Sequence, residues 1–206
     1  MLDRYIIQLI RRPLSYAATL LDKINITANQ VTLFGFALGC LAFPALLLEQ
    51  YQLALILIIA NRVCDGLDGA LARIQGLTDA GGFLDISLDF LFYSLIPFGF
   101  ILANPEANAI AGSLLIFSFI GTGCSFLSFA VMASKHGIID PVYQHKSLYY
   151  LGGLTEGSET IFFLLLFCLF PNQFSLLAYL FAAACWITTI TRLYSGFHTL
   201  AKLEQR

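Results

Sequence analysis

The sequence predicts an all-α, polytopic membrane protein with six transmembrane helices preceded by an N-terminal amphipathic interfacial helix. Of its 206 residues, 58% are hydrophobic and 12% are charged, whereas an ordinary soluble domain has about 25% charged residues. The stretch 107–134 contains no charged residue. As a helix it would be about 42 Å long, which is more than a bilayer requires. The chain is therefore expected to cross a membrane several times.

The first element is predicted to be a helix over residues 1–24. Its apolar residues fall on one helical stripe opposite a basic, polar face, which is typical of a helix lying in the membrane interface. A helix that packs on the rest of the chain is the alternative. No signal peptide is recognised, so the first spans are expected to direct insertion.

Six apolar segments follow and predict the transmembrane spans. The first begins at Thr27, whose hydroxyl can cap the free N–H groups of a helix start. The predicted spans are 27–48, 51–73, 81–102, 107–134, 155–170 and 173–199, the last two being separated by Pro171 and Asn172. We predict a single domain over 1–206, made of the interfacial helix 1–24 and a six-helix bundle 27–203.

The basic residues predict the orientation of this bundle. All eleven lysines and arginines fall before the first span, around the second and fourth connections, or toward the C-terminal end. Basic residues in short loops mark the cytoplasmic side. We therefore expect a multi-pass integral protein of a cell membrane, the bacterial inner membrane, with both termini cytoplasmic. The polar connection 135–153 would lie at the cytoplasmic mouth.

An acidic segment, DGLDGALARIQGLTDAGGFLDISLDF, connects the second and third spans at residues 65–90. Asp65 and Asp68 are three residues apart and Asp85 and Asp89 four apart, so each pair occupies one face of its helix. Two facing pairs would form a cage of four carboxylates. Asp79 fits neither spacing and is interpreted as a solvated loop acid.

Burying this cage requires positive charge. Each ionised carboxylate in a bilayer costs roughly 2.5 to 3.5 kcal/mol on insertion scales. A structural ion-pair network with Arg62 and Arg73 is one explanation, but two arginines cannot balance four carboxylates. Two divalent cations can, and hard oxygen ligands with open positions suit Mg²⁺ or Mn²⁺ bound partly through substrate phosphates.

Small residues and an arginine surround the acidic pairs. Glycines at 66, 69, 81 and 82 and Ala72 leave room for phosphates to approach the backbone. Arg73 can direct a planar guanidinium at a phosphate. Together with the four aspartates, these residues predict phosphoryl transfer assisted by two metal ions.

The segment resembles the signature D-x2-D-G-x2-A-R-x8-G-x3-D-x3-D of the CDP-alcohol phosphatidyltransferase family. The matching residues are Asp65, Asp68, Gly69, Ala72, Arg73, Gly81, Asp85 and Asp89, with seven residues instead of eight between Arg73 and Gly81. The resemblance implies six helices with the site on the cytoplasmic side. It implies that all four aspartates are metal ligands and that Asp89 also accepts the proton of the acceptor hydroxyl. It further implies that the CDP moiety is held by Asn29, Gly69, Arg73 and Thr78.

This resemblance implies a membrane transferase of phospholipid biosynthesis that uses Mg²⁺ or Mn²⁺. It would move a phosphatidyl group from a CDP-linked donor, CDP-diacylglycerol in the first instance, to an alcohol with release of CMP. An enzyme that joins a CDP-linked small alcohol to diacylglycerol is the alternative. A carboxylate-lined cation carrier would distribute its acidic groups across the bilayer, whereas these are clustered on one side. The expected partners are the donor, the alcohol and membrane lipids, without nucleic acid, and a homodimer is an expectation from the family.

Overall fold

The structure, a computed structural model, describes the backbone of residues 3–137 and 153–204 and the side chains of 12–137 and 153–203. The helices are α1 (Asp3–Lys23), α2 (Ala28–Leu47), α3 (Tyr51–Gln75), α4 (Asp79–Ala103), α5 (Pro105–Lys135), α6 (Gly157–Leu169) and α7 (Phe174–Glu204), with a short 3₁₀ turn η1 (Pro171–Gln173) before α7. The described residues form no strand, which confirms the all-α prediction. Most of the connection 135–153 lies outside the described residues.

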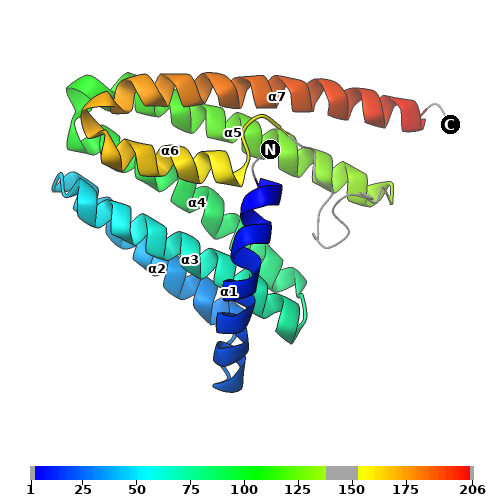
Figure 1. Cartoon of the computed structure of the whole chain (residues 1–206). Helices are drawn as coiled ribbons and strands as arrows, with labels where there is room; N and C mark the ends of the chain where they lie inside the picture. The colour runs from blue at the N-terminus through cyan, green and yellow to red at the C-terminus, as the bar shows by residue number, and fades with distance from the viewer. Residues whose placement is uncertain (1–2, 138–152, 205–206) are drawn as a thin grey trace.

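The helices pack as a bundle with α1 laid across it (Figure 1). α2 packs against α3 and α4, α4 also packs against α5, and α5 packs against α7. α1, dark blue in Figure 1, crosses α3 at a steep angle. The predicted helix over 1–24 is thus present, while its placement in a membrane interface stays a prediction.

Four of the described helices are long and apolar enough to cross a membrane. They are α2, α4, α5 and the segment Pro171–Leu203, which contains all of α7 but its last residue. α3 carries four charged residues, Arg62, Asp65, Asp68 and Arg73, and α6 has only 13 residues. The prediction of a membrane protein therefore holds for four spans, and the count of six stays a prediction.

Several aromatic side chains belong to the core against which α4 packs. Phe92 and Phe100 on α4 are almost completely buried. The ring of Phe100 stacks on that of Phe174, with centroids 4.6 Å apart, and Phe163 stacks on Phe181 at 4.3 Å. Because Phe92 follows Asp89 by one turn, this packing also sets which way the preceding acidic face of α4 points.

Two glycines let α2 approach its neighbours closely. A Cβ atom at Gly35 would lie 2.6 Å from Cβ of Cys64 on α3, and one at Gly39 would lie 2.7 Å from the ring of Phe92 on α4. Real Cβ contacts are not this short, so a larger residue would push the helices apart. The distance between α3 and α4 depends on these contacts because α2 packs against both helices.

We expect Gly35→Ala to lower the thermal midpoint of the protein in detergent. The added methyl group overpacks the α2–α3 contact, which typically costs about 1–3 kcal/mol. Gly69→Ala is the matched control, since a Cβ atom there meets only the Arg73 guanidinium, at 3.6 Å. Alanine is favoured over glycine inside a helix, so this control should match or exceed the wild type. Equal midpoints for the two variants would contradict the close-approach argument.

Candidate metal and nucleotide site

The turn between α3 and α4 brings the two acidic faces to one cavity. α3 ends at Gln75, and Gly76 follows with φ +100°, a conformation that favours glycine. Thr78 caps α4, and its hydroxyl accepts a hydrogen bond from the Gly81 N–H at 3.1 Å. Asp79 is exposed as expected, but it is the first residue of α4 and not a loop residue. Its negative charge there is favourable to the helix start.

The four aspartates at positions 65, 68, 85 and 89 meet between α3 and α4, and we call them the carboxylate cluster. One oxygen each from Asp65, Asp85 and Asp89 lie within 4.8 Å of one another. All four aspartates, Asp68 included, line one small cavity. Asp68 is 4% exposed, and its Oδ2 has no hydrogen-bond partner among the described residues. The structure thus gathers all four residues, while their roles as ligands stay predictions.

The donor set of this cluster fits a divalent cation. Carboxylate oxygens are hard ligands that suit Mg²⁺ or Mn²⁺. A buried polar atom without a partner, such as Oδ2 of Asp68 among the described residues, calls for an explanation, and an ion is one that fits its charge. The geometry therefore agrees with the expected chemistry.

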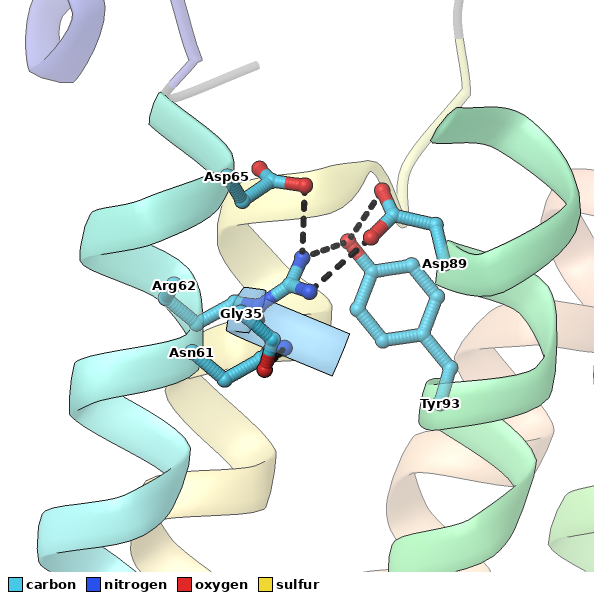
Figure 2. A network of polar contacts seen from close by, with 6 residues as sticks. All are labelled: Gly35, Asn61, Arg62, Asp65, Asp89 and Tyr93. Atoms are coloured by element: carbon cyan, nitrogen blue, oxygen red, sulfur yellow. Dashed lines mark hydrogen bonds and ion pairs between the residues drawn. The ribbon is translucent and has the colours of Figure 1, made fainter. Parts of the chain in front are cut away.

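Arg62 also belongs to this site. The sequence analysis considered it only as a member of the alternative ion-pair network. The structure places it well inside α3, with its side chain 8% exposed. Its guanidinium donates to Asp89 Oδ1 at 2.9 Å and to the Tyr93 hydroxyl at 3.0 Å, and Nη1 lies 3.5 Å from Asp65 Oδ1 (Figure 2). Tyr93 in turn donates to Asp89 Oδ2 at 3.4 Å. The ion-pair alternative is therefore realised for two of the four carboxylates.

A larger cavity of about 500 Å³ opens beside the carboxylate cluster. Its wall includes Asn29, Asp68, Gly69, Arg73, Thr78 and Asp85. All four residues predicted to hold the CDP moiety therefore line one cavity. Because Asp68 and Asp85 line both cavities, a ligand in the large cavity would reach the cluster directly.

Gln75 is a residue near the site that the sequence analysis missed. Its Oε1 accepts the backbone N–H of Ala28 at 3.1 Å, and its Nε2 donates to Asp22 Oδ1 at 3.0 Å and to the Ile26 carbonyl at 2.8 Å. These bonds tie the α1–α2 connection to the end of α3. They hold the start of α2, and with it Asn29, over the large cavity.

For the CDP-linked donor that the resemblance implies, we expect Gln75→Leu to raise the KM about tenfold and to change kcat much less. The variant loses three hydrogen bonds that position the cavity wall, each worth about 0.5–1.5 kcal/mol. Steady-state CMP release at varied donor concentration measures both constants. Gln52→Leu, an exposed position at the other end of α3, is the control and should leave both unchanged. An unaltered KM in Gln75→Leu would contradict the positioning role.

The chain is similar to proteins of a known family. The family model described as "CDP-alcohol phosphatidyltransferase" matches residues 25–193. The chain is 59% identical over 206 residues to the Inner membrane protein YnjF of Escherichia coli K12, covering 100% of both chains. It is 31% identical over 188 residues to an archaetidylinositol phosphate synthase of Pyrococcus horikoshii, covering 91% of this chain and 92% of the relative.

Solved structures share the fold. The phosphatidylinositol phosphate synthase of Mycobacterium tuberculosis with CDP-DAG bound aligns with a TM-score of 0.73 at 20% identity, covering 90% of this chain and 94% of that one. The same synthase in complex with manganese and citrate aligns with a TM-score of 0.71 at 20% identity, covering 89% and 88%.

The family match, the long apolar helices and the carboxylate cluster together identify a membrane transferase. The chain belongs to the CDP-alcohol phosphatidyltransferase family. It is therefore an enzyme of phospholipid biosynthesis, and members of this family use divalent metal ions.

Proposed function

We propose that the enzyme transfers a phosphatidyl group from CDP-diacylglycerol to an alcohol and releases CMP. The observation that carries the proposal is that Asp68 and Asp85 line both cavities. A nucleotide in the large cavity would place its pyrophosphate against the carboxylate cluster. The Mycobacterium tuberculosis synthase that shares the fold has CDP-DAG bound, which supports this donor.

In the proposed reaction, the acceptor oxygen forms a bond to the phosphorus beside the lipid. The bond from that phosphorus to the CMP oxygen breaks, and CMP leaves with the electron pair. Two divalent ions, Mg²⁺ or Mn²⁺, supply charge stabilisation for the pyrophosphate when bound. Asp65, Asp68, Asp85 and Asp89 would hold them.

The residues of the chain have distinct tasks in this reaction. Asn29, Gly69, Arg73 and Thr78 bind and orient the CDP moiety. Asp89 takes the proton from the acceptor hydroxyl, for which it must lie within hydrogen-bond reach of that group. The hydrogen bonds from Arg62 and Tyr93 fix the direction of the Asp89 carboxylate.

We also propose that the single domain 1–206 crosses the bacterial inner membrane six times through α2 to α7, with α1 in the interface. Both termini and the site would face the cytoplasm. The distribution of basic residues supports this orientation, and the name of the Escherichia coli relative supports the membrane. A homodimer stays an expectation from the family.

The test is to incubate the purified enzyme with CDP-diacylglycerol radiolabelled in the lipid, Mn²⁺ or Mg²⁺, and a panel of alcohols with and without a phosphate group. We expect metal-dependent CMP release and a labelled phospholipid with at least one alcohol. Product formed only from a CDP-linked small alcohol and diacylglycerol would favour the alternative transferase. Metal-driven ion flux in vesicles without CMP release would favour the cation carrier.

A further inference from the structure

The two halves of the carboxylate cluster have different surroundings. Asp65 and Asp89 both lie against the Arg62 guanidinium, at 3.5 and 2.9 Å. Asp68 and Asp85 instead line the wall of the large cavity, and Oδ2 of Asp68 has no partner among the described residues. The Asp65/Asp89 half of the cluster therefore already has a cation, the Arg62 guanidinium. The Asp68/Asp85 half has no such partner among the described residues and is open to a metal ion.

The cation in the first half is held firmly. Besides its bonds to Asp89 and Tyr93, Arg62 donates from Nε to the Asn61 side-chain oxygen at 2.7 Å (Figure 2). Asn61 is anchored in turn, because its amide donates to the Gly35 carbonyl on α2 at 2.8 Å. The guanidinium also lies 4.6 Å from the centroid of the Phe92 ring. Residues from three helices thus keep the guanidinium in place.

The charges of the site set a limit on metal loading. With Arg62 present, one divalent ion leaves the cluster with a net negative charge. A second ion would leave a net positive charge on a partly buried cluster, where charges interact more strongly than in bulk water. The phosphates of a bound nucleotide would supply the missing negative charge.

We propose that Arg62 is a built-in counterion that weakens metal binding at the Asp65/Asp89 half, so that the second metal ion loads only together with the donor pyrophosphate. The proposal rests on the two-ion site of the proposed function. The enzyme would then hold one metal ion at rest. Its full metal complement would assemble only around the CDP-linked substrate.

The test is Mn²⁺ binding to metal-stripped protein in detergent, followed by the paramagnetic resonance signal of free Mn²⁺, with and without CDP. For the wild type we expect one tight ion and a second that binds at least about tenfold more weakly unless CDP is present. In Arg62→Gln, the second ion should bind at least about tenfold more tightly without CDP, and CDP should add little. Mn²⁺ should also raise the thermal midpoint of Arg62→Gln more than that of the wild type, because the variant lacks its internal cation.

Two further variants separate charge from structure. Arg62→Lys keeps the positive charge and should keep the weak second site, even if Arg62→Gln fails to fold. Arg192→Gln removes another buried arginine, on α7, and should leave Mn²⁺ affinity unchanged. Two ions that bind with the same affinities to the wild type and to Arg62→Gln, or a tightened second site in Arg62→Lys, would overturn the counterion proposal and leave the proposed function standing. Absence of Mn²⁺ binding in all of these proteins, with and without CDP, would remove both.

Discussion

Asp89→Asn is expected to lower kcat for CMP release by roughly a thousandfold. A general base typically contributes about 10²–10⁴ in rate, and an amide cannot accept the hydroxyl proton. The substitution keeps the shape of the side chain but removes the charge that pairs with Arg62 at 2.9 Å and one oxygen ligand of the cluster. The measurement is initial CMP release at saturating donor, acceptor and Mn²⁺.

The variant should still bind nucleotide, which distinguishes lost chemistry from lost folding. Asp89 lines the small cavity, whereas Asn29, Gly69, Arg73 and Thr78 line the large one. The variant is therefore expected to lose only the contribution to CDP binding that comes through the bound metal, and to keep the contribution of the large cavity. Asp79→Asn is the matched control, because Asp79 is an exposed acid on the same helix, and its kcat should stay within about twofold of the wild type. Normal turnover in Asp89→Asn would exclude this residue as the base.

The helices of this protein could be read from the sequence because apolar runs and breakers alternate so clearly. The capping prediction at Thr27 is confirmed, since its side chain accepts the Gln30 N–H at 3.3 Å while the Gln30 side chain accepts the Thr27 N–H at 2.9 Å. The convergence of the aspartates also followed from spacing, because residues three or four apart share a helix face. Membrane crossing by α3 and α6 does not follow from length and composition, since polar residues interrupt one and the other is short.

The residues that the sequence analysis missed fall into two kinds. Arg62 and Tyr93 had a detectable signal, because each lies three or four residues from an aspartate of the cluster, Asp65 and Asp89 respectively, and so shares its face. Arg62 was considered only as a partner in the ion-pair alternative, because a basic residue near an apolar span is expected to mark a cytoplasmic end. Gln75 had no such signal. Its role depends on how the α1–α2 connection docks on α3, a contact between segments that local spacing does not encode.

Asp68→Asn is expected to remove most of the stabilisation that metal gives the protein. In the wild type, the buried Oδ2 of Asp68 has no partner among the described residues, so the metal-free protein holds a carboxylate whose burial is only partly compensated. An ion that binds only the folded state raises the thermal midpoint, by several degrees when its concentration is far above its dissociation constant. We expect this rise in the wild type on adding Mn²⁺ after chelation, and a much smaller rise in the variant.

Without metal, the effect of Asp68→Asn on the thermal midpoint should have the opposite sign. Asparagine fills the same space and carries no charge, so in the presence of a chelator Asp68→Asn should match or exceed the thermal midpoint of the wild type. Its CMP release should be about a hundredfold lower and should recover in part at high Mn²⁺, because a ligand is lost while the other three aspartates remain. A structural role for Asp68 predicts a lower midpoint with or without Mn²⁺. The thermal midpoint measured with chelator therefore shows which role Asp68 has. A lower midpoint in the variant means that the carboxylate stabilises the fold, and an equal or higher one means that it destabilises the metal-free protein and serves to bind an ion.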